Sequence, residues 1–235
     1  MVVIDFSPKI DREKLAKMLG DKNHQGLSPS LAGKIDIHMA GIDALLTPRL
    51  DYRTLEIGST ENGILELKEG MKFASKKLAK TMSRCVEAIS FIATIGENIE
   101  NKINKLTADN QLSDAFILDS MGSLLVEGFV NQFQQNMQNK YLQEKRSTSI
   151  RFSPGYCDWP IVEQKKLFEL FNKDSIAVRL NDACLMSPRK SISGIFGISS
   201  RKTREWVSAY NPCTECGKKG CSERRKQRIR FFKTQ

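Results

Sequence analysis

The sequence predicts an α+β domain, in which long helices pack against a sheet of short strands. Residues 112–143 contain no proline and place apolar side chains at i, i+3 and i+4 spacing, which is typical of one long helix. Residues 85–95 are mainly apolar and end at Gly96, which indicates a buried strand. The other predicted strands are short and non-alternating, and together with the long helices they favour the α+β class.

The N-terminal part of the chain begins with two predicted helices. Residues 11–19 place apolar side chains at helical spacing, with Asp11 as a candidate N-cap and Gly20 as a stop. A polar, turn-rich loop follows. A second helix is expected from about Ser30 to Leu46, because the residue before Pro48 disfavours the helical conformation.

The middle of the chain is predicted to mix extended and helical segments. Residues 52–67 are expected to be extended, with a Glu-Asn-Gly turn at 61–63. Residues 70–82 are basic and are predicted to be helical, and a further helix is predicted at 97–106. After the long helix, the predicted elements are a strand leading into Arg151, a tight turn at 154–155, a helix at 161–171, and strands at 178–185 and 191–198.

Composition limits the class of protein. Hydrophobic residues make up 40% and charged residues 27% of the 235 residues, which is ordinary for a soluble globular protein. No apolar run approaches the roughly 20 residues that a membrane-spanning helix needs, and the N-terminus does not resemble a secretion signal. Six cysteines without such a signal indicate reduced thiols or a metal site. We expect a cytoplasmic protein with no membrane association.

The net charge of +10 is concentrated at the C-terminal end. Residues 201–235 hold 11 Lys/Arg and 3 Asp/Glu, a local balance of +8, whereas the other 200 residues have a balance of only +2. The isoelectric point of the whole chain is therefore no argument for nucleic-acid binding. We expect one domain, made of an N-terminal region at 1–70 and a core at 71–200, followed by a basic, cysteine-rich tail at 201–235.

The ten residues from Arg151 to Pro160 are the strongest candidate for a ligand site. The guanidinium of Arg151 is a planar, permanently charged fork that can bind a carboxylate in two places. Pro154 and Gly155 predict a tight turn, and the hydroxyl of Tyr156 can both donate and accept a hydrogen bond. This arrangement suits a small zwitterionic ligand held against main chain.

A polar stripe on the predicted long helix supplies a second candidate contact. Most of the surface of this helix is apolar, so the helix should be largely buried and its polar stripe should face something specific. The carboxylate of Glu127 could pair with an ammonium or sulfonium group there. The alternative is a stripe that only faces solvent. The polar residues recur every seven positions, with two more one turn to either side of Glu127: Ser113, Ser120, Ser123, Glu127, Asn131 and Gln134.

The motif Arg-x-x-Pro-Gly-Tyr at residues 151–156 resembles the signature of the activation domain of cobalamin-dependent methionine synthase, which binds S-adenosylmethionine (AdoMet). The similarity extends to residues 180–188, which resemble the family's strand through Met-x-Pro, and to Ser-x-Ser-Gly at 191–194. Upstream, the segment around Glu127 resembles the family's glutamate-bearing helix. The resemblance covers about residues 75–198. The Pro-Gly-Tyr-x-Asp-x-Pro form of the motif and the cysteine-rich tail are more similar to the stand-alone activation proteins of anaerobic bacteria than to the long enzyme.

This resemblance implies a twisted antiparallel sheet with long helices, and a site in which Arg151 binds the AdoMet carboxylate. No catalytic side chain is implied. The family's tyrosine-bearing strand is not recognisable after Ile198, and its N-terminal aspartate cannot be assigned to a residue here. The implied AdoMet-binding residues are Glu127, Arg151, Phe152, Ser153, Pro154, Gly155 and Tyr156.

The implied function is the reductive reactivation of cobalamin. An electron from flavodoxin or ferredoxin reduces inactive cob(II)alamin, and AdoMet methylates the product. Because the sequence lacks the homocysteine, folate and cobalamin modules of the long enzyme, we expect it to serve a separate cobalamin-bearing methionine synthase core as the methyl-donor component. Two alternatives stay open: an activator of another corrinoid methyltransferase, and a metal- and nucleic-acid-binding protein that keeps this fold.

The segment Asp36-x-His38-x-x-Gly41 matches the pattern whose histidine ligates cobalt in corrinoid-binding domains. That pattern should open a helix after the first strand of a doubly wound domain and be followed by a Gly-Gly pair, which this sequence lacks. We therefore interpret it as a chance match on a helix near the surface.

The tail contains the cysteine spacing C-x2-C-x4-C, at Cys213, Cys216 and Cys221. Three nearby thiolates suit a zinc site or an iron–sulfur cluster, and the alternative is a tail with unligated thiols. A fourth ligand could come from Cys157, Cys184, water or a neighbouring subunit. The positive charge around these cysteines could attract an acidic protein partner, which we favour, or nucleic acid.

Overall fold

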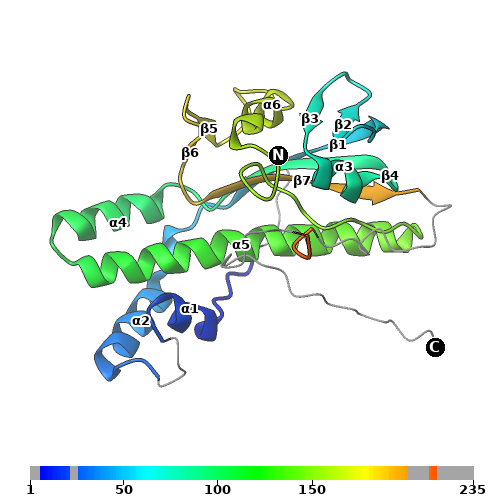
Figure 1. Ribbon diagram of the computed structural model, residues 1–235. Coiled ribbons are helices and arrows are strands. Elements are labelled where there is room, and N and C mark those ends of the chain that lie inside the picture. The colour runs from blue at the N-terminus through cyan, green and yellow to red at the C-terminus, as the bar shows by residue number, and fades with distance from the viewer. Residues whose placement is uncertain (1–5, 22–25, 201–211, 216–235) are drawn as a thin grey trace, which may run out of the picture.

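A five-stranded sheet forms the centre of the computed structural model, which describes residues 6–21, 26–200 and 212–215 (Figure 1). The strands are β1 (Arg49–Ser59), β2 (Ile64–Leu67), β3 (Lys72–Ala74), β4 (Cys85–Thr94), β5 (Arg179–Leu180), β6 (Met186–Ser187) and β7 (Ser191–Ser199). The main sheet has the order β3-β2-β1-β4-β7, and each neighbouring pair is antiparallel. β5 and β6 form a separate antiparallel pair.

Helices cover both faces of this sheet. They are α1 (Arg12–Met18), α2 (Pro29–Gly41), α3 (Lys76–Met82), α4 (Asn98–Ala108), α5 (Leu112–Gln143) and α6 (Gln164–Glu169), with short 3-10 helices η1 (Asp43–Leu45) and η2 (Ile161–Glu163). In Figure 1, α5 runs along one face of the sheet with α4 beside it, and α1 and α2 lie beyond α5. α3 and α6 lie on the opposite face. The long helix therefore lies between the sheet and the N-terminal helices along part of its length (Figure 1).

β4 is the central strand of the fold, and most of its side chains are buried. It pairs with β1 and β7 over nearly its whole length. Ile89 and Phe91 belong to the apolar core under α5, whereas Ala88 and Ile92 belong to a second core that contains Trp159. A strand with apolar neighbours on both faces is expected to be mainly apolar, which explains why its sequence identified it.

Several predicted elements are confirmed. The long helix at residues 112–143 has the predicted bounds, and α1 carries Asp11 as its N-cap, with the Asp11 carboxylate accepting from the Lys14 N–H at 3.1 Å. The turn between β1 and β2 is also confirmed. Asn62 and Gly63 there have φ angles of 53° and 75°, the left-handed conformation that an Asn-Gly hairpin turn requires.

The predicted helix at 70–82 is wrong in its first half, which forms β3. The ring of Phe73 is fully buried and packs edge-on against Trp159, with 5.4 Å between ring centroids. This tertiary contact outweighs the helical character of the local sequence. α3 then begins after Ser75, whose hydroxyl accepts a hydrogen bond from the N–H of Leu78.

The predicted strand at 178–185 is also wrong, because only β5 at its start is extended. The side-chain oxygen of Asn181 accepts from the N–H of Leu185 at 2.8 Å, and its carbonyl accepts from the N–H of Cys184 at 2.9 Å. These bonds turn the chain back into β6. Instead of a full strand leading into Arg151, two isolated bridges to β7 flank this residue, at Thr148 and Phe152. The predicted helix at 161–171 consists of η2 followed by the shorter α6.

The observed mixture of helices with an antiparallel sheet confirms the predicted α+β class. The boundaries predicted at residues 70 and 200 stay predictions. Within the described part of the chain, no helix combines the length and the apolar character that crossing a membrane requires.

Candidate ligand site at the Arg151 turn

Arg151 and Glu127 form an ion pair between the turn and the long helix. Nη2 of Arg151 lies 2.7 Å from Oε2 of Glu127, and Nη1 donates to Oδ1 of Asn131 at 3.2 Å. The Arg151 side chain is only 10% exposed, whereas that of Glu127 is 44% exposed. A buried guanidinium needs an anionic or polar partner. α5 supplies both partners, because Glu127 and Asn131 lie one turn apart on the same face.

The position of Arg151 depends on close contact between its neighbour and β7. Phe152 and Ile195 exchange two main-chain hydrogen bonds, of 2.9 and 2.8 Å. A β-carbon at residue 194 would lie 2.6 Å from the carbonyl oxygen of Phe152. Only glycine at position 194 lets the main chain of Phe152 come this close to β7. This close contact is a physical reason for the glycine that ends the Ser-x-Ser-Gly motif at 191–194.

The turn after Phe152 is tight and anchored at its end. Gly155 has a φ of +88°, and its N–H donates to the carbonyl of Trp159 at 2.8 Å. The N–H of Tyr156 donates to the carbonyl of Ser153 at 3.2 Å. Trp159 is buried in the second core, whereas Tyr156 is 51% exposed. The turn thus presents the Tyr156 side chain and main chain at the surface while Trp159 fixes its end.

The polar stripe on α5 faces other parts of the chain, not only solvent. The side-chain amide of Gln134 donates to the carbonyl of Ser149 at 3.2 Å. Further along the helix, Nζ of Lys190 lies 2.9 Å from the Ser123 hydroxyl and 2.8 Å from a carboxylate oxygen of Asp119. The stripe therefore meets two segments that flank the turn.

The sequence did not identify Lys190, although its side chain is only 10% exposed. A glycine in the middle of the long helix was the available signal. A β-carbon at Gly122 would lie 3.1 Å from Cε of Lys190, so the glycine makes room for the lysine stem. An interior helical glycine often marks such a close approach.

A polar groove of about 290 Å³ adjoins the ion pair. Its walls come from α5 and the segment before Arg151, and Asn131 belongs both to the groove and to the contacts of Arg151. The hydroxyl of Thr148 is buried and has no hydrogen-bond partner among the described residues. The groove is lined by Asn131, Gln134, Gln135, Gln138, Thr148, Ser149 and Ile150.

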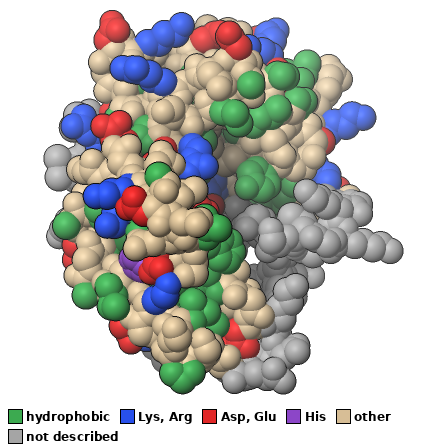
Figure 2. All heavy atoms as spheres, turned by 90° about the vertical axis from the view of Figure 1, so that its left-hand side faces the viewer, with side chains coloured by type: hydrophobic (Ala, Val, Ile, Leu, Met, Phe, Trp, Pro, Cys, Tyr) green, Lys and Arg blue, Asp and Glu red, His purple; other side chains and the backbone are tan. Residues whose placement is uncertain are grey.

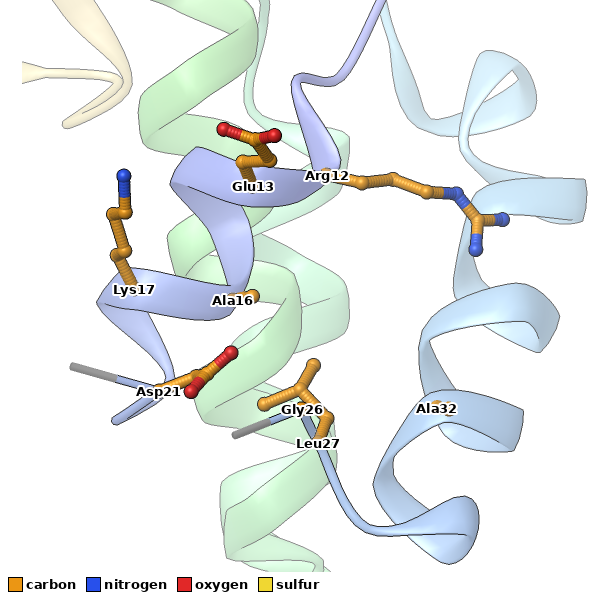
Figure 3. Close-up of a pocket in the computed structure, with 8 residues that line it drawn as sticks. All are labelled: Arg12, Glu13, Ala16, Lys17, Asp21, Gly26, Leu27 and Ala32. Carbon is orange, nitrogen blue, oxygen red and sulfur yellow. The ribbon is translucent and has the colours of Figure 1, made fainter. Parts of the chain in front are cut away.

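A second hollow, of about 300 Å³, lies between α1 and α2, and none of its lining residues belongs to the groove beside Arg151 (Figure 3). Ala16, Leu27 and Ala32 contribute apolar surface to it. In Figure 3 the side chain of Arg12 extends across toward α2, where its guanidinium binds the carboxylate of Asp36 at 2.6 Å. The charge of Arg12, which lines this hollow, is thus already balanced by Asp36, which does not line it.

His38 lies on α2 and contacts α5. Its Nε2 is 3.0 Å from Oδ1 of Asp114, whose other oxygen binds Nζ of Lys34. Figure 2 shows the histidine in purple, among acidic and basic side chains on the surface. The hydrogen bond from Lys34, and then the one from His38, lower the pKa of the Asp114 carboxyl against the opposing effect of burial. The interpretation of the Asp-x-His-x-x-Gly match as part of an ordinary helix agrees with this contact.

Of the predicted metal ligands, the structure describes Cys213, which is half-buried. Cys216 and Cys221 lie outside the described residues. Within the described ranges, no group of three or more potential ligands is gathered to hold a metal ion. Cys157 is exposed beside Tyr156, and Cys184 is buried in the turn between β5 and β6.

The comparisons with known proteins identify the family and the fold of this chain. The family model described as "Vitamin B12 dependent methionine synthase, activation domain" matches residues 78–209, more than half of the chain, including Glu127 and Arg151. The fold is similar to that of the crystal structure of the MetH reactivation domain bound to AdoHcy, with a TM-score of 0.60 and 15% identity, covering 81% of this chain and 70% of that chain. No curated protein matches the sequence. The chain belongs to the family of activation domains of vitamin B12 dependent methionine synthase.

Proposed function

We propose that this protein binds AdoMet at the Arg151 turn and presents its methyl group to the cobalamin of a methionine synthase core, thereby reactivating that enzyme. The observation that carries the proposal is the buried Arg151 guanidinium, held by Glu127 inside the region that the activation-domain family matches. The similar reactivation domain was crystallised with AdoHcy, the demethylated form of AdoMet, which supports the same ligand class here.

The residues of the turn fit an amino-acid end group. The fork of Arg151 is suited to a carboxylate, and Glu127 is exposed enough to exchange the guanidinium for an ammonium group. Exchange of partners would leave neither charge unpaired. The polar groove beside Asn131, with the unsatisfied hydroxyl of Thr148, offers hydrogen-bonding surface for the remainder of the ligand.

The chain's own part in the reaction is positioning. Bound AdoMet supplies an electrophilic methyl group, and the acceptor is carried by the partner protein. The main chain from Phe152 to Gly155 is fixed by the bridge to Ile195, and Tyr156 is exposed at its end. A rigid wall of this kind lowers the entropic part of the barrier by restricting the ligand's orientation. The electron is expected from a flavodoxin or ferredoxin.

AdoMet titration by calorimetry tests the site. Arg151→Ala should weaken binding roughly 10- to 100-fold, the loss expected for a charge-assisted hydrogen bond. The affinity of Arg151→Lys for AdoMet should lie between those of the unaltered protein and Arg151→Ala, because lysine keeps the positive charge but lacks the two-pronged guanidinium. Arg179→Ala, an exposed arginine on β5, is the matched control and should bind as the unaltered protein does. Equal affinity of Arg151→Ala and the control would contradict the proposal.

A second experiment tests the role in reactivation. A methionine synthase core without its own activation domain, trapped in the cob(II)alamin state, is mixed with this protein, AdoMet and a reductant. Methionine formation should return only when AdoMet and the protein are both present, and Arg151→Ala should fail to restore it. AdoMet binding without rescue would instead favour another corrinoid methyltransferase as the partner.

A further inference from the structure

We propose that Lys190 is a positioning residue for the ligand site, because it holds α5 in the register at which Glu127 meets Arg151. Lys190 lies outside the Arg-x-x-Pro-Gly-Tyr motif and directly precedes β7. Its consequence for AdoMet binding rests on the function proposed above, whereas its consequence for the ion pair between Glu127 and Arg151 does not.

The main chain of Lys190 is fixed where β7 begins beside the end of β4. Its carbonyl oxygen accepts hydrogen bonds from the N–H of Ile95 and from the hydroxyl of Thr94, both at 3.2 Å. Its own N–H donates to Oε1 of Glu100 on α4, at 2.9 Å. The next residue, Ser191, pairs with Thr94 in the sheet. The backbone at residue 190 therefore has a defined place relative to the sheet and to α4.

The side chain of Lys190 crosses from the sheet to α5. Its Nζ donates to the hydroxyl of Ser123 at 2.9 Å and lies 2.8 Å from Oδ1 of Asp119. The stem passes over Gly122, where a β-carbon would lie 3.1 Å from Cε of the lysine. Because this side chain is only 10% exposed, its ammonium group depends on these oxygen atoms in place of water.

This contact constrains how α5 can slide or turn against the sheet. Moving the helix by one residue would shift Ser123 by about 1.5 Å along the axis and turn it by about 100°. Either displacement would separate the hydroxyl from Nζ of Lys190. The large apolar side chains of α5 also hold it to the sheet, but apolar contacts are not directional and restrict the register less.

Glu127 lies on the stretch of α5 that this contact fixes. Ser123 and Glu127 are four residues apart, so they share one face of the helix and are about 6 Å apart along its axis. The place of the Glu127 carboxylate relative to β7 is therefore set within one helical turn of the anchor at Ser123.

Arg151 is held to the same strand from the other side. Phe152, the next residue, exchanges two main-chain hydrogen bonds with Ile195 of β7. Both members of the ion pair are thus placed with reference to one strand, Glu127 through Lys190 and Arg151 through Phe152. Their hydrogen bond of 2.7 Å requires the two placements to agree, because a guanidinium–carboxylate contact is sensitive to geometry.

A double-mutant cycle tests the effect on the ion pair without any ligand. The coupling energy between Glu127→Gln and Arg151→Met is measured by urea unfolding, in the unaltered protein and in Lys190→Met. Methionine keeps a stem beside Gly122 but lacks the ammonium group. The coupling should fall to roughly half or less in Lys190→Met, because the two side chains are no longer placed to meet.

Lys34→Met is the matched control for this cycle. Lys34 also forms an ion pair with α5, through Asp114, but it belongs to α2 and not to the sheet. This substitution should lower stability while leaving the coupling between Glu127 and Arg151 unchanged. Ser123→Ala is a milder second variant, which removes the hydroxyl that Lys190 contacts and should reduce the coupling in the same direction.

Calorimetry tests the effect on AdoMet binding. Lys190→Met should weaken binding about 10-fold, because a small misplacement of a binding group has a large effect on the interactions it makes. In the Arg151→Ala background the same substitution should have little further effect, since Lys190 acts through the ion pair. Lys34→Met should bind AdoMet as the unaltered protein does.

An unchanged coupling in both Lys190→Met and Ser123→Ala would overturn the proposal. So would equal effects of Lys190→Met and Lys34→Met on the coupling, which would indicate a general loss of stability. Losses of AdoMet affinity that add fully in Lys190→Met with Arg151→Ala would show an independent contact and contradict the positioning role. Failure of the unaltered protein to bind AdoMet would contradict the proposed function alone, because the unfolding cycle needs no AdoMet.

Discussion

The carbonyl oxygen of Phe152 lies so close to Gly194 that a β-carbon at residue 194 would be only 2.6 Å away. The main chain cannot easily separate there, because Phe152 and Ile195 exchange two hydrogen bonds. We expect Gly194→Ala to lower the free energy of unfolding by about 1–3 kcal/mol, as overpacking typically does, and to weaken AdoMet binding by moving the turn. Urea unfolding and calorimetry measure the two effects.

Gly128→Ala is the control for this prediction. It lies on α5, and a β-carbon there would meet no described atom within 4 Å. This substitution should raise the free energy of unfolding by about 0.5–1 kcal/mol, because alanine favours the helix. If Gly194→Ala proved as harmless as Gly128→Ala, the close approach at β7 would be unimportant.

The ion pair between Arg151 and Glu127 should contribute measurably to stability. A double-mutant cycle with Glu127→Gln and Arg151→Met should give a coupling energy of about 1 kcal/mol, because one partner is buried and the other half-exposed. Both side chains of the Arg12–Asp36 pair are exposed, so the same cycle on that pair should give a coupling energy below about 0.5 kcal/mol. Urea unfolding measures both cycles, and equal couplings would contradict the difference in burial.

Stability should fall in acid partly through Asp114. Its pKa is lowered by the hydrogen bond from Lys34 and by that from His38, so the folded state favours the ionised carboxylate. This contribution is present above the unfolded pKa of about 3.9 and is lost as the pH falls through the lower pKa of the folded state. Asp114→Asn should reduce stability at pH 7 and flatten its decline in acid, as followed by urea midpoints between pH 7 and pH 2. Asp182→Asn, at an exposed position, is the control, and its urea midpoints should change with pH in the same way as those of the unaltered protein.

Cys85 should be chemically inert in the folded protein. Burial raises the pKa of its thiol to about 12, and the nearby charge of Arg146 only partly opposes this effect. Iodoacetamide at pH 8 should modify the exposed Cys157 of metal-free protein and leave Cys85 unmodified until the chain is unfolded, as determined by mass spectrometry. Modification of both residues at similar rates in the folded state would be inconsistent with the buried position.

The elements that the sequence predicted well are those whose patterns are local. The long helix follows from its spacing of apolar residues, and the turn at Asn62 follows from the left-handed conformation that Asn-Gly favours. β3 was missed because it depends on Phe73 meeting Trp159, more than 80 residues away. No local pattern encodes such a contact.

In the candidate site, too, the residues marked by a local pattern were found from the sequence, and those that depend on tertiary contacts were not. The motif at 151–156 made Arg151 a candidate, and the polar stripe made Glu127 one, but the sequence did not predict that these two residues pair with each other. Lys190 and Thr148 were missed, because their importance comes from burial against α5 and not from their neighbours in the sequence. The stripe was recognised, but what it faces depends on tertiary structure.

If AdoMet binds at the Arg151 turn as proposed, the pairing of Arg151 with Glu127 should also make the site selective between ligands. The site is electrically balanced before any ligand arrives, so a simple anion such as phosphate gains little by entering, since it would have to displace a carboxylate and leave that carboxylate unpaired. A molecule that brings an anion and a cation together can satisfy both residues at once. Compounds with only one of the two charges should therefore compete poorly for this site.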